Sequence, residues 1–188
     1  MKTENKIIKH LVEDKESIII SELSRKIKAD YKIIHTAVNR LVDKGILTSK
    51  KIGKSIQVSF NNRFSNEVFQ VEYERREEIL KNKNIQVMTD EIKKNLKKSN
   101  FVLLLFGSYA KRKESKNSDI DIMFIIDSKY EKKIDNIIQL LPLKIHYLIF
   151  TEEQFIDMKN SQELNVVKEA IKNNIILYGI EQYYDLIK

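Results

Sequence analysis

The stretch FGSYAKRKESKNSDIDIMFII, residues 106–126, is the most informative part of the sequence because it sets polar residues between two apolar segments. Gly107 and Ser108 directly follow an apolar run, ten residues pass, and Asp119 and Asp121 then stand one residue apart in a second apolar run. Alternate residues of a β-strand share a face, so the two aspartates are expected to point the same way, with their isoleucine neighbours toward the core. Two carboxylates this close repel each other unless a cation lies between them.

This spacing suggests a ligand that carries phosphate and a metal ion. Oxygen ligands suit Mg²⁺, which keeps several waters and is shared with substrate phosphates. A glycine at a strand-to-helix turn lets backbone N–H groups approach a phosphate closely. The motif is therefore interpreted as a phosphate-binding turn, Gly107 and Ser108, beside a metal-binding pair, Asp119 and Asp121. Two adjacent strands would bring them together.

Composition limits the classes of protein that the chain can represent. Its 188 residues suffice for one ordinary domain or two small ones. No apolar run approaches eighteen residues and the first ten residues lack the apolar region of a signal peptide, so a cytoplasmic protein without a membrane partner is expected. The chain has no cysteine, which excludes disulfides and cysteine-based zinc sites or nucleophiles.

The net charge of +7 lies entirely in the first third of the chain. Residues 1–63 hold 14 lysines and arginines against 7 acidic residues, whereas the remainder holds 20 of each. A basic segment beside a neutral one suggests different partners, with an acidic polymer for the first. A solvated lysine-rich surface is the alternative interpretation.

Local patterns in the first third predict three helices followed by a hairpin. Apolar residues recur at helical spacing in residues 4–12, a short helix is expected within residues 21–29, and residues 31–44 carry a clean apolar stripe. Asp30 is a suitable N-cap for the third helix, and Gly45 suits the left-handed residue that ends it. Two short β-like runs around Gly53 then predict a small hairpin.

This order resembles the winged helix-turn-helix domain, from Glu4 to about Asn61. In that family the third helix enters the major groove and the wing touches the DNA backbone. The resemblance implies that duplex DNA is bound by exposed helix residues and by wing lysines, namely Lys32, His35, Thr36, Asn39, Arg40, Lys50, Lys51 and Lys54. Such domains also serve for dimerisation or protein docking, which is the alternative.

The middle of the chain is predicted to contain two further helices. Residues 63–82 and 86–98 follow helical patterns, and the acids and bases of EYERREE, residues 72–78, are expected to pair at i, i+4. The predicted organisation is thus a winged helix-turn-helix domain over residues 1–62, linking helices over residues 63–98 and a second domain over residues 99–188.

The second domain resembles the DNA polymerase β-like nucleotidyltransferases. GSYAKRKESKNSDIDI is similar to the family signature of Gly-Ser, ten residues and Asp-x-Asp, most closely in the minimal nucleotidyltransferases of bacteria and archaea, including those used as antitoxins and those fused to a winged helix. LKIHYLIFTEEQF looks like the family's third strand and the start of the next helix, and IKNNIILYGIEQYYDLI like its closing strand and last helix. The resemblance, from about Phe101 to Tyr184, implies an α/β (α+β) fold with a short mixed sheet flanked by helices.

The same resemblance implies a chemistry. Members of the family use Mg²⁺ or Mn²⁺ to move a nucleoside monophosphate from a nucleoside triphosphate to a hydroxyl group, and ATP is the first candidate substrate here. The acceptor could be a small molecule, an RNA end or a protein such as a cognate toxin. A homodimer is also considered.

Two residues depart from the family pattern. Arg112 stands where the family usually has glycine, and His146, five residues before Thr151, stands where it commonly has a third carboxylate that helps to bind metal and prepares the attacking hydroxyl. His146 is therefore assigned as catalytic beside Asp119 and Asp121, with the alternative of a partly buried histidine in a site that no longer turns over. Two functions remain open: a transferase, and a transcription regulator that senses nucleotide.

Overall fold

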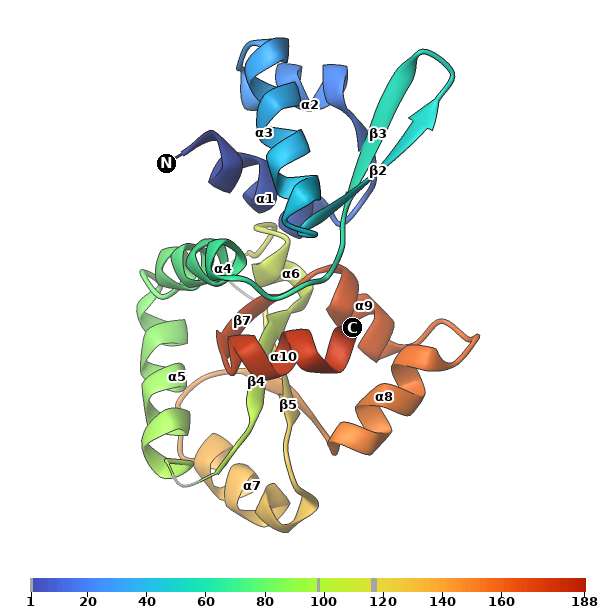
Figure 1. Ribbon diagram of the computed structural model, residues 1–188. Helices are drawn as coiled ribbons and strands as arrows, with labels where there is room; N and C mark the ends of the chain where they lie inside the picture. The colour runs from blue at the N-terminus through green and yellow to red at the C-terminus, as the bar shows by residue number, and fades with distance from the viewer. Residues whose placement is uncertain (1, 98, 116–117) are drawn as a thin grey trace. The chain divides into compact units, whose positions relative to one another are not determined.

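The computed structural model describes residues 2–97, 99–115 and 118–188, which form two compact units (Figure 1). The first unit ends at Val71, and the second runs from Glu72 to Ile187. The boundary lies inside one helix, α4 (Asn66–Ile79). Among the described helices, none is both long and apolar enough to cross a membrane.

The first unit consists of three helices and a small antiparallel sheet. In chain order its elements are α1 (Thr3–Asp14), β1 (Ile18–Ile19), α2 (Ile20–Ile27), α3 (Tyr31–Asp43), β2 (Leu47–Ile52) and β3 (Ser55–Phe60). The strand order is β1-β3-β2, so β2 and β3 form the hairpin. The three helices followed by a hairpin are confirmed.

The caps of α3 follow the sequence prediction. The Asp30 carboxylate accepts hydrogen bonds from the backbone N–H of Lys32, at 2.8 Å, and of Ile33, at 3.4 Å, so donors at the helix start are satisfied. Gly45 has φ +69°, the left-handed conformation predicted for the helix end. The apolar stripe of α3 is buried against the first helix, which contributes residues that are at most 1% exposed, Ile7, Ile8, Leu11 and Val12.

The second unit is built on a four-stranded sheet with helices on both faces. Its elements after α4 are α5 (Lys83–Asn95), β4 (Val102–Phe106), α6 (Gly107–Ala110), β5 (Ile120–Ile125), the 3₁₀ turn η1 (Ser128–Tyr130), α7 (Glu131–Gln139), β6 (Ile145–Phe150), α8 (Glu152–Asn160), α9 (Val166–Lys172), β7 (Ile175–Tyr178) and α10 (Ile180–Ile187). The strand order is β6-β5-β4-β7, with β5 and β6 parallel and the other pairs antiparallel. The predicted short mixed sheet is confirmed.

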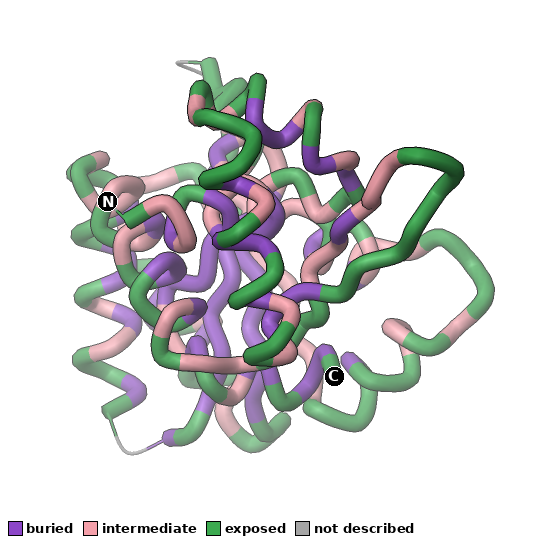
Figure 2. The backbone as a smooth tube through the Cα atoms, turned by 45° about the horizontal axis from the view of Figure 1, so that its top comes forward, coloured by how far each residue is buried: buried purple, intermediate pink, exposed green. Residues whose placement is uncertain are grey.

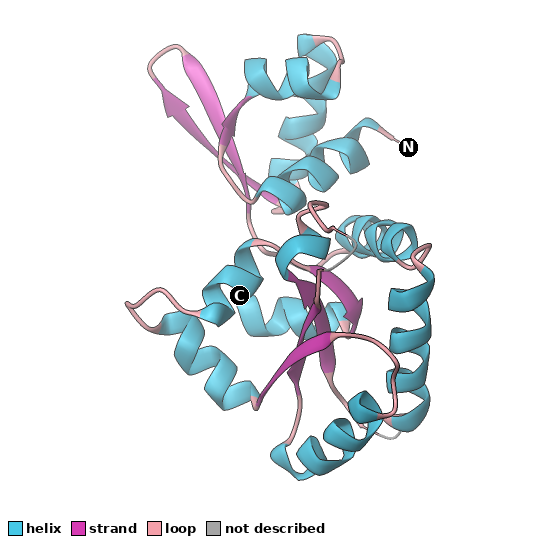
Figure 3. Cartoon of the chain, turned by 180° about the vertical axis from the view of Figure 1, so that it is seen from behind, coloured by secondary structure: helices cyan, strands magenta, loops and turns pink. Residues whose placement is uncertain are grey.

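Different helices cover the two faces of this sheet (Figure 3). Side chains of α5 and α7 pack with alternate residues of the strands, including Leu103, Leu105 and Ile122, in one buried cluster. Helices α8, α9 and α10 contact the strands of the sheet on the opposite face. The central strands are accordingly the most buried part of this unit (Figure 2).

Helix α5 belongs to the core of the second unit and is more than a linker. Ile85, Met88, Ile92 and Leu96 are fully buried and join the cluster formed with β4 and β5. The sequence predicted that the helices over residues 63–98 link the domains, whereas α5 packs in the second core. The helical pattern showed an apolar stripe but not the strands that it packs against. The connection between the units is α4.

The charged run on α4 contains a buried ion pair. Glu72 and Arg75 pair at i, i+3, with 2.5 Å between Oε2 and Nη1, and they are only 1% and 5% exposed. Tyr184 donates a hydrogen bond to the other Glu72 oxygen at 2.7 Å, and Arg75 donates one to the Asn174 carbonyl at 2.7 Å. Burial, followed by the nearby Glu72 charge, raises the pKa of the Tyr184 hydroxyl well above its ordinary value, so Tyr184 stays a donor. This network fixes α4 to the C-terminal segment.

Removing one partner of the buried pair is expected to destabilise the chain strongly. Arg75→Ala leaves the Glu72 carboxylate buried without its cation, so we predict a loss of about 3–5 kcal/mol in the free energy of unfolding. Glu91 and Lys94 offer a matched control, because they also pair at i, i+3, at 3.3 Å, but on the exposed surface. Lys94→Ala should change stability by less than about 1 kcal/mol. Chemical denaturation followed by circular dichroism measures both, and equal losses would contradict the assignment.

Candidate functional site

Three strand ends meet at one edge of the second unit's sheet. In the antiparallel pair β4–β5, Phe106 at the end of β4 lies opposite Asp121, near the start of β5. In the parallel pair β5–β6, the same Asp121 lies beside His146. Because α6 begins directly after Phe106, the turn at Gly107 lies next to both strand starts.

The closest approach at this edge is between Gly107 and Asp121. Gly107 has φ +68°, and a Cβ placed on it would lie 2.1 Å from Asp121 Oδ2 and 2.8 Å from its Cγ. Only glycine therefore fits, both for its backbone conformation and for the space that the carboxylate fills. The two halves of the motif, separated by ten residues after Ser108, are in contact in the folded chain.

The second oxygen of the same carboxylate is bound to His146. Asp121 Oδ1 lies 3.1 Å from His146 Nδ1, and the two side chains are 25% and 60% exposed. When Asp121 is ionised it only accepts hydrogen bonds, so Nδ1 is the protonated nitrogen of the neutral ring and Nε2 keeps its lone pair. Thr151 caps α8 through a capping box. His146, five residues before Thr151, is thus next to the aspartate motif.

Two other predicted site residues have side chains that make no hydrogen bond to a described residue. Asp119 precedes β5, is exposed, and its carboxylate has no hydrogen bond or ion pair within the part of the chain that the structure describes. The Ser108 hydroxyl, which is partly exposed, likewise makes no hydrogen bond to a described residue. Over residues 2–97, 99–115 and 118–188, no group of three or more His, Cys, Asp or Glu side chains is arranged to hold a metal ion.

The loop after the turn keeps a left-handed residue although it lacks the family glycine. Arg112 has φ +52°, a conformation that costs a non-glycine residue about 1–2 kcal/mol. Its Nη2 donates to Glu78 Oε2 at 2.8 Å, and Lys111 Nζ donates to Glu169 Oε1 at 3.0 Å. No local pattern indicated these two ion pairs, because the partners lie 34 and 58 residues away along the chain.

The residues expected to contact DNA are on the surface of the first unit. His35 is half-buried, and the others are exposed, namely Lys32, Thr36, Asn39 and Arg40 on α3 and Lys50, Lys51 and Lys54 in the β2–β3 hairpin. The positions expected to face DNA are therefore accessible on both elements.

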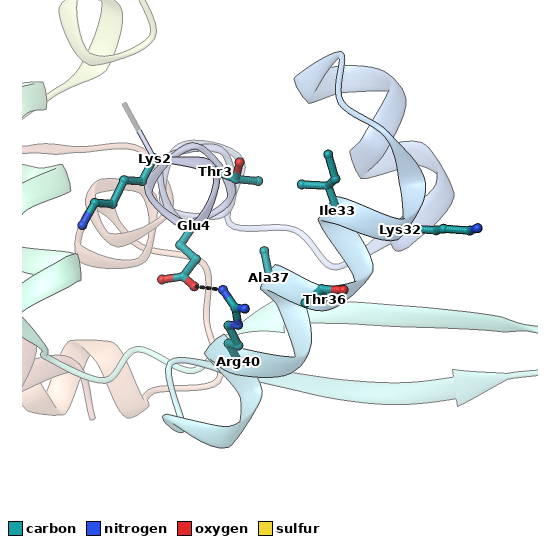
Figure 4. Close-up of a pocket in the computed structure, with 8 residues that line it drawn as sticks. All are labelled: Lys2, Thr3, Glu4, Lys32, Ile33, Thr36, Ala37 and Arg40. Carbon is teal, nitrogen blue, oxygen red and sulfur yellow. Dashed lines mark ion pairs between the residues drawn. The ribbon is translucent and has the colours of Figure 1, made fainter.

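An acidic residue lies beside one of these positions (Figure 4). The start of α1 and one side of α3 line an open groove of about 600 Å³, in which Glu4 lies 3.8 Å from the Arg40 guanidinium and 3.9 Å from the Lys44 ammonium. Lys44 also donates to Glu67 at 2.6 Å, a hydrogen bond that raises the pKa of Lys44. Arg40 and Lys44 thus share the Glu4 carboxylate, which the sequence pattern did not indicate.

Comparison with protein families gives two matches. The model of the family "Polymerase beta, Nucleotidyltransferase" matches residues 86–183, and that of the family "Penicillinase repressor" matches residues 2–98. Both matches include most of α5, whose buried side chains pack in the second unit. No curated protein and no solved structure matches the chain significantly.

The contact between Gly107 and Asp121 predicts a measurable coupling. Gly107→Ala should destabilise the chain by the left-handed strain of about 1–2 kcal/mol plus the overlap of the new methyl group with the carboxylate. In an Asp121→Ala background the carboxylate is absent, so the same substitution should cost about the strain alone. Unfolding free energies of the parent, both single variants and the double variant measure the difference. Effects that add within about 0.5 kcal/mol would contradict the contact.

Proposed function

The chain belongs to the polymerase β nucleotidyltransferase family and to the penicillinase repressor family, and on that premise we propose that it is a nucleotidyltransferase tethered to a DNA-binding domain. It moves a nucleoside monophosphate from a nucleoside triphosphate, with ATP as the first candidate, to a hydroxyl acceptor. The observation that carries the proposal is the contact between the Asp121 carboxylate and the Gly107 turn, because it joins a cation-binding group to a phosphate-binding turn.

The donor set fits a divalent cation that is shared with phosphate. Asp119 and Asp121 supply carboxylate oxygens, the ligands that Mg²⁺ and Mn²⁺ prefer, and Asp119 has no partner among the described residues. Because no described group of three acidic or imidazole ligands exists, these two residues would hold the ion together with nucleotide oxygens and water. When bound, the ion neutralises charge on the phosphates.

The protein's own residues would perform the remaining tasks. Backbone N–H groups at Gly107 and Ser108, with the free Ser108 hydroxyl, hold the triphosphate. The acceptor oxygen attacks the α-phosphorus and forms a new P–O bond, while the bond to the β-phosphate breaks and pyrophosphate leaves with its electron pair. The hydroxyl proton passes to His146 Nε2, whose ring Asp121 orients through Nδ1. Catalysis is mainly positioning and charge neutralisation.

The His146–Asp121 hydrogen bond also favours a second candidate function. A carboxylate that is occupied by imidazole, at the position of a missing third acid, suits a domain that binds nucleotide without transferring it. The chain would then be a transcription regulator that senses nucleotide. Duplex DNA is the proposed partner of the first unit in both cases. A protein acceptor such as a cognate toxin, and a homodimer, are proposed partners of the transferase.

Nucleotide binding should depend on the two aspartates and on the divalent ion. We expect Asp119→Asn/Asp121→Asn to lose Mg²⁺-dependent binding of nucleoside triphosphate, with the fold retained because a like-charge pair is removed. Equilibrium binding of ATP, CTP, GTP and UTP with Mg²⁺, with Mn²⁺ and with chelator measures this. Exposed Asp127→Asn/Asp157→Asn is a control of equal charge change. Unchanged nucleotide affinity in the Asp119/Asp121 variant would exclude this site.

Substitution of His146 should separate the transferase from the sensor. With labelled triphosphates and cell extract as the source of acceptor, we expect the parent to transfer nucleotide in Mg²⁺ and in Mn²⁺, because His146 accepts the hydroxyl proton and does not ligate the ion. His146→Asp, which keeps a proton acceptor at this position, should retain activity, and His146→Ala should lower activity in both metals. If both variants match the parent, His146 has no role in transfer. If no variant transfers nucleotide but the parent binds it, the chain is a sensor.

A further inference from the structure

One stripe of α3 carries three side chains that contact each other in sequence. Tyr31, His35 and Asn39 are spaced at i, i+4 and i+8, so they follow one another along the helix surface. The Tyr31 and His35 rings lie 5.9 Å apart between centroids at an interplanar angle of 32°. The Asn39 amide nitrogen lies 3.4 Å from His35 Nδ1. The exposed Asn39 side chain is therefore held in one orientation by the half-buried His35.

The hydrogen bond determines which groups Asn39 has left to offer. The amide nitrogen has two N–H donors, and His35 Nδ1 accepts one of them. One N–H and the carbonyl oxygen remain, a donor beside an acceptor. In the major groove, adenine presents an N6–H donor beside an N7 acceptor, whereas guanine presents two acceptors and cytosine one donor. The remaining edge of Asn39 matches adenine.

Other side chains of α3 are less suited to bidentate reading of a base. Arg40, the helix's one arginine, lies beside the Glu4 carboxylate at 3.8 Å, on the side that faces the start of α1. Lys32 provides a point charge without a planar fork, and Thr36 provides a single hydroxyl. Asn39 is thus an exposed side-chain amide on α3, with a donor and an acceptor and no ionic partner among the described residues.

We propose that Asn39 reads an adenine in the major groove and that His35, packed on Tyr31, is its positioning residue. The inference rests on the DNA-binding function proposed for the first unit and adds the class of sequence that it recognises: a half-site with an A·T pair facing Asn39. A bidentate contact of this kind discriminates by about 1–3 kcal/mol against the wrong base, which corresponds to roughly a 5- to 150-fold change in affinity.

Selection from randomised duplex DNA with the full-length chain tests the proposal. The enriched sequence should contain an adenine whose replacement by guanine, with the complementary base exchanged, weakens binding at least about fivefold. Asn39→Ala should bind the original and the replaced duplex with equal affinity. His35→Ala should reduce the discrimination at that base pair, whereas His35→Gln, which keeps an acceptor, should preserve part of it.

Lys51→Ala is the matched control, because it removes a contact to the DNA phosphates that does not depend on base sequence. Because Lys51 is an exposed wing lysine, its loss should weaken binding to every duplex by the same factor and lower the salt dependence by about one counterion. If Asn39→Ala keeps every base preference of the parent, the inference is overturned while DNA binding stands. If the parent binds no duplex, with or without nucleotide, both the inference and the DNA-binding proposal are overturned.

Discussion

The contact between the Asp121 carboxylate and the Gly107 backbone is the constraint on which the second unit's site depends. It requires a residue without a side chain at the end of β4 and a left-handed backbone there, and both are met by Gly107. It also places one carboxylate oxygen at the turn and leaves the other to His146. The sheet order β6-β5-β4 is what brings these three residues to one edge, since β5 lies between the strand that ends in the turn and the strand that carries the histidine.

Local chemistry made part of this arrangement predictable. The Asp30 cap, the Gly45 stop and the hairpin around Gly53 are determined by residues close in sequence, and all three were confirmed. The approach of the Gly-Ser turn to the aspartates was predictable because two short strands joined by a ten-residue connection tend to pair. The family resemblance put His146, five residues before Thr151, at the position of a third acid, and the parallel register of β5 and β6 pairs it with Asp121.

Features that depend on distant residues could not be predicted in the same way. The helical pattern of EYERREE did not indicate that Glu72 and Arg75 are buried. Their hydrogen-bond partners, Tyr184 and Asn174, lie about a hundred residues further along the chain. Glu4 precedes Arg40 by 36 residues and lies on another helix, so no local rule predicts that its carboxylate lies 3.8 Å from the Arg40 guanidinium. The apolar stripe of α5 was recognisable, but its place in the second core was decided by β4 and β5.

Crystals of the full-length chain grown with Mn²⁺ and a non-hydrolysable ATP analogue would show whether the Gly107 turn and the two aspartates bind triphosphate and metal. The anomalous signal of manganese locates the ion, and the electron density locates the phosphates. The proposed function predicts manganese bound to a carboxylate oxygen of Asp119 or Asp121 and the triphosphate on the backbone N–H groups of Gly107 and Ser108. Nucleotide bound at another place, or no nucleotide and no manganese at this edge at saturating concentrations, would contradict it.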